Sequence, residues 1–349
     1  MKNLRHLSHD ALRDVVLSLN EKPFRVKQIE EWLWQKGADS IDAMSNLSKS
    51  FREQLNAEYS LNALKVHHAQ YSDDGTIKNR FITHDGHFVE GVLIPTETRM
   101  TACVSSQVGC SLSCKFCATG YLERKRNLEF DEIVDQVVLL NQQAEKHFGK
   151  RLSNIVFMGM GEPLLNYKAV LKAIERITSP EGLGMSPTRI TVSTAGIAKM
   201  IRQLADDAVR FNLALSLHAA TDLQRNEIMP INESNNLKVL IDALNYFYTK
   251  TKNPVTFEYI LFDQFNDSEQ DADHLIKICR KVPAKVNIIE YNPIGMAEYR
   301  KPSDENVDRF MNYLAKHKVN ARLRRSRGKD IDAACGQLAN VNNTTTSAL

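Results

Sequence analysis

Between about residue 100 and residue 330, short apolar runs alternate with longer amphipathic segments. The apolar runs predict strands at 101–106, 154–159, 189–194, 211–217, 255–262 and 285–291. The amphipathic segments predict helices at 130–147, 167–177, 197–206, 237–250, 270–281 and 305–317. Strands and helices in regular alternation specify a parallel α/β sheet with helices outside it, either open or closed into an incomplete barrel. Functional side chains are then expected at the carboxyl ends of the strands.

Two further regions precede this one, and a tail follows it. Residues 1–60 carry apolar side chains at helical spacing, as at Val26, Ile29 and Leu33, and predict a helical accessory domain. This domain either binds RNA or only packs on the main domain. Residues 61–100 alternate in polarity around Asp74-Gly75 and Asp85-Gly86, which predicts a β-hairpin or meander connection. Residues 101–338 form the main domain, and the polar residues 339–349 predict a flexible tail.

Composition excludes few functions. The net charge of the 349 residues is only +3, so a nucleic-acid surface must be local, and the basic run from Arg322 to Lys329 is the candidate. Individual arginines of this run could equally belong to a solvated face. The sequence shows neither a signal peptide nor an apolar stretch of membrane-spanning length. We therefore expect a cytoplasmic protein, in which six cysteines serve some purpose other than structural disulfides.

Three of these cysteines, Cys110, Cys114 and Cys117, follow the first predicted strand of the barrel region. A structural zinc site normally takes four protein ligands, and no second cysteine pair lies nearby to complete one. A catalytic zinc ion with three cysteines is possible but unusual. A [4Fe–4S] cluster held by three cysteines leaves one iron open. The CxxxCxxC spacing, with Phe116 before the last cysteine, resembles the radical SAM superfamily. This resemblance implies one cluster per chain, whose open iron binds S-adenosylmethionine (SAM).

Small or polar residues follow the later strands at the same predicted edge, and they are candidates for the SAM pocket. They are Gly161 and Glu162 after the second strand, Ser193 after the third, Ser216, Leu217 and His218 after the fourth, and Asn292 after the sixth. Glycine lets a ligand approach the backbone closely, and a carboxylate accepts hydrogen bonds from an ammonium group. Each position also has a simpler explanation: a helix cap for the serines, a structural role for the histidine and a turn at Asn292-Pro293.

Several longer motifs extend the resemblance over nearly the whole chain. They are FRVKQI at 24–29, WLW at 32–34, VEGVLIP at 89–95, CVSSQVGC at 103–110, GMGEP at 159–163, RSRG at 325–328 and ACGQL at 334–338. This set resembles the RlmN/Cfr family of radical SAM RNA methyltransferases, and within it the branch that methylates carbon-2 of adenine. The resemblance implies an incomplete (β/α)6 radical SAM barrel. It also implies 23S rRNA and tRNA as substrates, an electron donor such as a flavodoxin-type reductant and, we expect, a monomer.

The same resemblance implies roles for three residues outside the cluster motif. Cys335 takes a methyl group from a first SAM, and cleavage of a second SAM turns that group into a radical that adds to the base. Glu90 removes the ring hydrogen, and Cys103 attacks the sulfur of Cys335 to free the product, leaving a Cys103–Cys335 disulfide bond. Without the resemblance, Glu90 would be interpreted as a solvated charge on a hairpin. Cys279, in a helical pattern, is interpreted as a core residue.

Two other functions stay open on the sequence alone. The first is methylation of carbon-8 of adenine by the same machinery, as in the Cfr branch. The second, from a different class, is a non-catalytic RNA-binding protein stabilised by zinc.

Overall fold

The computed structural model describes residues 1–340, and residues 341–349 lie outside the described part. One ten-stranded sheet organises the molecule, in the order β14-β13-β12-β11-β10-β9-β6-β5-β4-β3. Its parallel strands are β6 (Met100–Cys103), β9 (Asn154–Phe157), β10 (Ile190–Thr194), β11 (Asn212–Ser216), β12 (Val255–Leu261), β13 (Ala284–Glu290) and β14 (Ala321–Arg324). All of these strands except β14 begin within a few residues of a predicted strand, so the α/β prediction is confirmed.

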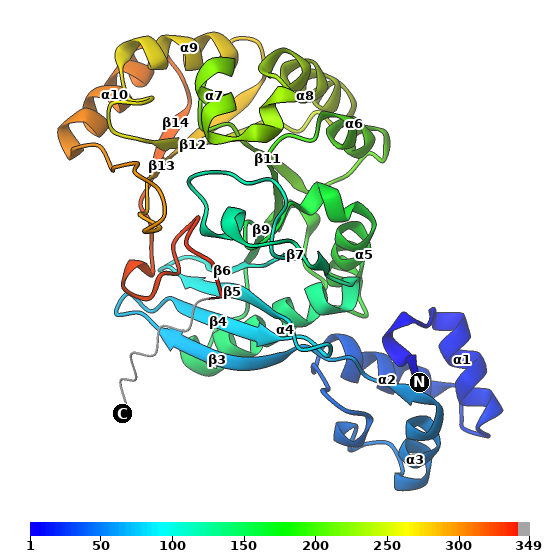
Figure 1. Cartoon of the computed structure of the whole chain (residues 1–349). Helices are drawn as coiled ribbons and strands as arrows, with labels where there is room; N and C mark the ends of the chain where they lie inside the picture. The colour runs from blue at the N-terminus through cyan, green and yellow to red at the C-terminus, as the bar shows by residue number, and fades with distance from the viewer. Residues whose placement is uncertain (341–349) are drawn as a thin grey trace.

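Helices connect the parallel strands and cover the outside of the sheet (Figure 1). They are α4 (Phe130–Phe148), α5 (Tyr167–Thr178), α6 (Ala198–Asp206), α7 (Asp222–Ile228), α8 (Leu237–Thr251), α9 (Glu269–Cys279) and α10 (Asp304–Lys316). Local sequence fixes their ends. Glu129 and Glu132 form a capping box at the start of α4, and Gly149 ends that helix in the left-handed conformation (φ 62°). The resulting partial barrel is the architecture that the family resemblance implies.

The N-terminal region forms a small helical unit beside the barrel (Figure 1). Its helices are α1 (His9–Ser18), α2 (Phe24–Trp34) and α3 (Lys49–Glu58), and a short parallel pair joins β1 (Lys2–Asn3) to β2 (Tyr59–Ser60). Buried polar contacts attach the unit to α4. Arg5 pairs with Asp135, and Asn3 Nδ2 donates to Asp131 at 2.8 Å.

The strands β3 (Lys65–Tyr71), β4 (Ile77–Ile82) and β5 (Phe88–Pro95) form an antiparallel meander. Gly75 and Gly86 take positive φ values of 85° and 82° in its two turns, as the Asp-Gly pairs predict. The meander is not a separate connection, because β5 pairs with β6 and extends the main sheet. An open edge of the barrel sheet is thereby paired rather than exposed.

Strand β14 and helix α7 are among the elements that were not predicted. Strand β14 begins the basic run and pairs with β13, so part of that run belongs to the sheet. Helix α7 lies between β11 and α8. The predicted tail is held at its first two residues, since Ala339 N donates to Glu90 Oε2 and Asn340 Nδ2 donates to the carbonyl of Phe88.

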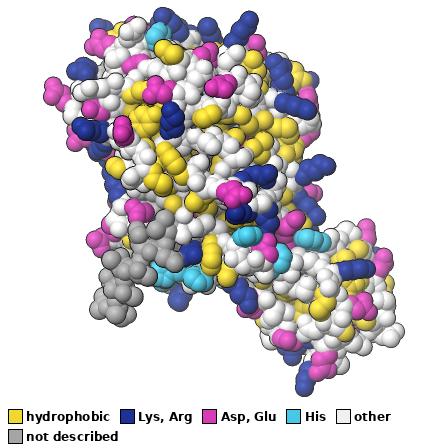
Figure 2. All heavy atoms as spheres, in the orientation of Figure 1, with side chains coloured by type: hydrophobic (Ala, Val, Ile, Leu, Met, Phe, Trp, Pro, Cys, Tyr) yellow, Lys and Arg dark blue, Asp and Glu magenta, His cyan; other side chains and the backbone are white. Residues whose placement is uncertain are grey.

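The surface carries both signs of charge. Figure 2 shows basic and acidic side chains interspersed over the visible face, as a net charge of +3 suggests. Among residues 1–340, none of the helices is long and apolar enough to cross a membrane.

Candidate active site

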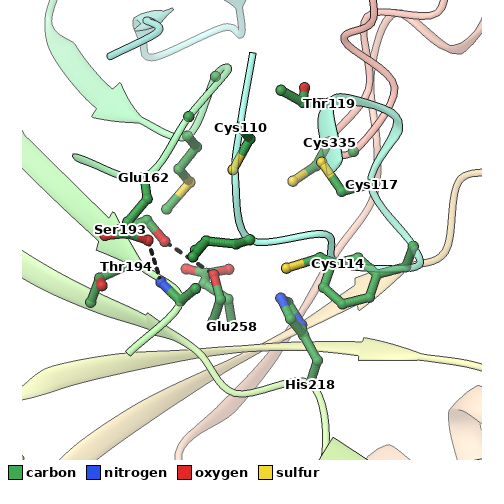
Figure 3. A pocket seen from close by; sticks show the side chains of 18 of the residues that line it. Cys110, Cys114, Cys117, Thr119, Glu162, Ser193, Thr194, His218, Glu258 and Cys335 are labelled. Carbon is green, nitrogen blue, oxygen red and sulfur yellow. Dashed lines mark hydrogen bonds between the residues drawn. The ribbon is translucent and has the colours of Figure 1, made fainter. Parts of the chain in front are cut away.

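Three cysteines lie on the loop between β7 (Gln107–Val108) and the short helix η3 (Ala118–Tyr121). Cys110, Cys114 and Cys117 all line one cavity, called here the first cavity (Figure 3). The loop is tight, because a Cβ atom on Gly120 would lie 2.6 Å from the carbonyl oxygen of Cys114. Burial raises the pKa of all three thiols, that of Cys110 to about 11. Buried thiols of this kind become thiolates when a metal group supplies positive charge.

The spacing of the three sulfurs tests which metal group fits. Within the described residues, these cysteines are not part of any set of three ligand atoms lying within 4.8 Å of one another. Ligands at 2.3 Å from a single tetrahedral zinc ion lie about 3.8 Å apart. In this structure the three cysteines do not have the spacing of ligands on one zinc ion, and three cysteine ligands suit a [4Fe–4S] cluster with one open iron. This spacing argues against the zinc alternative.

The C-terminal segment is hydrogen-bonded to the same loop, which brings Cys335 to the first cavity. Ala118 N donates to the carbonyl of Gly336 at 2.7 Å, and Thr119 Oγ1 donates to the carbonyl of Leu338 at 2.6 Å. Asn292 Nδ2 donates to the carbonyl of Cys335 at 3.3 Å. Asn292 is thereby placed beside the first cavity, although its own side chain is not among those that line it.

Gly161 and Glu162 end the loop after β9 and line the first cavity. Gly161 has a φ of 92°, and a Cβ atom there would lie 2.4 Å from the Cβ of Gln107, so only glycine fits. Glu162 Oε2 accepts from Ala195 N at 2.7 Å and Oε1 from Leu164 N at 3.0 Å. Burial raises the pKa of Glu162, although the bond from Ala195 lowers it. Glu162 thus fixes the loop after β10, and a hydrogen bond with the Thr194 side chain also lowers its pKa.

The other predicted strand-end residues divide into two groups. Ser193, Ser216 and His218 line the first cavity, with the two serine hydroxyls 3.4 Å apart. His218 Nδ1 accepts from Ile260 N at 3.1 Å, and burial lowers its pKa to about 3, so the ring is neutral. Leu217 is buried beside them without lining the cavity.

A second cavity lies on the inner side of the curved sheet. Polar side chains from successive strands line it, including Thr101, Asn154, Thr191, Thr256, Asn287 and Arg322. Cys103 lines this cavity, and Cys335 lines both cavities. Cys335 therefore stands in the wall between the space beside the cysteine loop and the polar interior of the barrel.

Cys103 and Cys335 are free thiols in the structure. Burial and the nearby Cys335 raise the pKa of Cys103 to about 12. Although Cys335 as a whole residue is exposed to solvent, its thiol lies among protein atoms that raise its pKa to about 11, and the positive charge of Arg324 opposes that rise. The predicted Cys103–Cys335 disulfide bond is not supported. The resemblance implies that bond only after turnover, whereas both thiols here are protonated and unbridged.

Glu90 lies in β5 and is only 1% exposed, so it is not a solvated hairpin charge. Its Oε1 is 3.3 Å from Nζ of Lys78, which is also buried, and its Oε2 accepts from Ala339 N at 2.9 Å. Glu90 lines neither cavity, but Leu338, the residue before Ala339, lines both. The carboxylate therefore sits directly behind the cavity wall.

The basic run is partly neutralised within the molecule. Arg322, Arg324, Arg325 and Arg327 line the second cavity. Arg325 and Lys329 pair with Glu290, and Arg327 pairs with Asp74. Sequence reasoning missed Glu258, which lines both cavities from the middle of β12. The available signal was one glutamate inside an otherwise apolar strand, VTFEYIL.

Comparison with known proteins agrees with this arrangement. The model of the "Ribosomal RNA large subunit methyltransferase N-terminal domain" matches residues 2–61, and that of the "Radical SAM superfamily" matches residues 104–276. The chain is 56% identical to the "Probable dual-specificity RNA methyltransferase RlmN" of Cytophaga hutchinsonii, covering 97% of this chain and 93% of that protein. It is 54% identical to the protein of the same name from Flavobacterium psychrophilum, with coverages of 97% and 98%. The crystal structure of a radical SAM methyltransferase from Sphaerobacter thermophilus superposes with a TM-score of 0.92 at 39% identity, covering 97% and 99% of the two chains.

Proposed function

The chain belongs to the RlmN family of dual-specificity RNA methyltransferases, and from that premise we propose that it methylates carbon-2 of adenine in 23S rRNA and tRNA through a methyl group carried on Cys335. One observation carries the proposal. Cys335 stands between the first cavity, with its three cysteines, and the second cavity, which also contains Cys103.

The cofactor residues follow from the first cavity. Cys110, Cys114 and Cys117 would hold a [4Fe–4S] cluster, and Gly161, Glu162, Ser193, Ser216 and His218 would contact SAM. When bound, the cluster supplies the electron that cleaves SAM to a 5′-deoxyadenosyl radical. Because His218 is neutral and already accepts a backbone hydrogen bond, it contributes one N–H donor and no charge.

The chemistry of the base explains why a cysteine carries the methyl group. Carbon-2 lies between two ring nitrogens and is too electron-poor to attack the methyl group of SAM. A thiolate is a strong nucleophile for that methyl group, and Cys335 takes it by displacement. The charge of Arg324 favours the Cys335 thiolate against the burial that disfavours it. Loss of one hydrogen atom to the radical derived from SAM would let the S-bound methyl carbon bond to carbon-2. The base would then be joined to Cys335 through a methylene group, and the surplus electron would return to the cluster.

Release of the product uses residues on the other side of Cys335. Glu90 accepts the original ring hydrogen as a proton, which requires the segment at Leu338 and Ala339 to move, because the Ala339 amide occupies its Oε2. Cys103 then attacks the sulfur of Cys335. This forms a Cys103–Cys335 disulfide bond and breaks the bond between that sulfur and the methylene carbon, which takes up a proton to become the new methyl group. The raised pKa of Cys103, about 12, means that this thiol must lose its proton as the attack occurs.

The partners are proposed on the same basis. The adenine must leave its stack to reach the interior of the barrel. Those arginines of the basic run that line the second cavity, together with the N-terminal helices, would contact phosphates. We expect a monomer that works in the cytoplasm and receives electrons from a flavodoxin-type reductant.

Three single variants test the proposal. Cys335→Ala should abolish methylation while leaving the iron content and visible absorption of the reconstituted protein unchanged. Cys103→Ala should accumulate a covalent protein–RNA adduct, seen on a denaturing gel. Cys279→Ala is the matched control, since Cys279 lies in α9 and lines neither cavity. Continued turnover by either of the first two variants would refute the assigned roles.

A further inference from the structure

The second cavity is where the target base must lie if the proposed function holds. Cys335 is bonded to the base, and Cys103 must reach the sulfur of Cys335 to release it. Both cysteines line the second cavity, whereas only Cys335 lines the first. A side chain that helps to select the base should therefore line the second cavity.

Glu258 is a buried carboxylate in this wall with one oxygen left unused. The residue is 4% exposed. Its Oε1 accepts from Asn287 Nδ2 at 2.8 Å. Its Oε2 accepts no hydrogen bond from any residue between 1 and 340, and lies 3.9 Å from Arg324 Nη1, beyond hydrogen-bonding distance. A buried carboxylate oxygen without a donor is costly, so a donor that arrives with a ligand would satisfy it.

The residues that orient Glu258 lie on the side of the second cavity. Asn287 and Arg324 line that cavity and not the first. Asn287 is directly opposite Glu258 in the parallel register of β12 and β13. The carboxylate is thus fixed by groups that face the interior of the barrel, although Glu258 itself borders both cavities.

We propose that Glu258 accepts a hydrogen bond from the exocyclic amine of the target adenine and so helps to select adenine over bases with a 6-carbonyl group. The amine lies on the same Watson–Crick edge of adenine as carbon-2, the atom presented to Cys335. A carboxylate accepts from an amine but is repelled by a carbonyl oxygen. The inference rests on the proposed function, and it adds a selectivity residue to it. SAM also carries N–H and O–H donors, and the test below distinguishes the two sources.

The experiment compares the reconstituted wild type with Glu258→Gln on short RNA hairpins. The target position carries adenosine, inosine or purine riboside, all of which keep a hydrogen on carbon-2. The wild type should methylate the adenosine RNA at least about 100-fold faster than either analogue, because a site built for a hydrogen bond rejects ligands that cannot make it. In Glu258→Gln the adenosine-to-inosine ratio should fall below about tenfold, since an amide can donate to the 6-carbonyl group.

Controls separate this inference from the proposed function. Glu305→Gln, an exposed carboxylate on α10, should keep the wild-type ratio. If the wild type fails to methylate adenosine RNA, the proposed function itself is wrong. If Glu258→Gln keeps the wild-type ratio, the inference is wrong, and a simultaneous loss of SAM affinity in equilibrium dialysis would assign the donor to SAM. If Glu258→Gln does not fold, the rates of the wild type on adenosine RNA and on purine riboside RNA test the inference. Equal rates on the two RNAs would overturn it.

Discussion

Gly161 and Gly86 share a positive φ but differ in their surroundings, which separates two reasons for using glycine. A Cβ atom on Gly161 would lie 2.4 Å from the Cβ of Gln107, whereas one on Gly86 would meet no atom within 4 Å. The turn at Gly86 needs only the left-handed backbone. The loop at Gly161 needs that backbone and also the empty space beside Gln107.

We predict that Gly161→Ala destabilises the protein clearly more than Gly86→Ala does. The left-handed conformation costs a non-glycine residue about 1–2 kcal/mol, and this applies to both variants. Gly161→Ala adds a contact that forces Gln107 to shift, so SAM affinity should fall as well. Urea unfolding and equilibrium dialysis measure the two effects. Equal unfolding free energies for the two variants would contradict the crowding argument.

The sequence predicts which residues lie at the site, but it does not predict which groups those residues hydrogen-bond to. The strand-end positions of Glu162, Ser193 and His218 could be predicted because the carboxyl ends of parallel strands share one edge. Which group each side chain contacts could not be. Asn292 binds the backbone of Cys335, a residue far along the chain, and no local pattern encodes that contact.

At the scale of elements, the segment that carries Cys335 is attached to β13 by one carboxylate. Glu290 Oε2 accepts from Lys329 Nζ at 2.8 Å and from Ser326 N at 3.2 Å, and Oε1 lies 3.0 Å from Nζ of Lys301. The sequence predicted the helices and most strands from periodicity. It missed β14, because four residues of alternating alanine, leucine and arginine form a strand only when β13 is beside them.

The attachment of the Cys335 segment to β13 through Glu290 should weaken in acid. Burial raises the pKa of Glu290, but hydrogen bonds from Lys329, Lys301 and Ser326 outweigh it and lower that pKa from 4.5 to about 2. As the pH falls, the Glu290 carboxylate therefore binds a proton in the unfolded chain before it does so in the folded protein. The stabilisation from Glu290 is complete above about pH 4.5 and is lost as the pH falls toward 2.

We expect Glu290→Gln to reduce the acid dependence of the unfolding free energy between pH 6 and pH 3. Urea unfolding at several pH values measures it for the variant and the wild type. Asp304→Asn, which removes an exposed partner of Lys301, is the control and should match the wild type. The explanation fails if Glu290→Gln retains the full acid dependence of the wild type.

At the scale of the whole molecule, the N-terminal unit joins the barrel through a buried charge pair. Arg5 pairs with Asp135 of α4 and also donates to the carbonyl of Ala38 at 3.1 Å. Leu64 N donates to the same carboxylate at 2.8 Å. The sequence predicted a helical unit at this end of the chain, but the partner of Arg5 is 130 residues away and could not be predicted.

Arg5→Met should cost about 3–5 kcal/mol of stability, because it leaves Asp135 buried without its cation. Hydrogen exchange in α1, α2 and α3 should rise at the same time, since the unit loses its main polar attachment. Lys65→Met breaks the exposed pair with Asp39, 3.6 Å apart, and should cost about 1 kcal/mol or less. Similar losses in the two variants would show that the buried pair does not hold the unit in place.

The central claim is that this chain methylates carbon-2 of adenine in RNA. The most direct test reconstitutes the protein anaerobically with iron and sulfide, adds SAM, a reductant and a 23S rRNA fragment, and identifies the product nucleosides by chromatography and mass spectrometry against standards. The account predicts 2-methyladenosine together with 5′-deoxyadenosine. The appearance of 8-methyladenosine, or cleavage of SAM with no methylated adenosine, would contradict it.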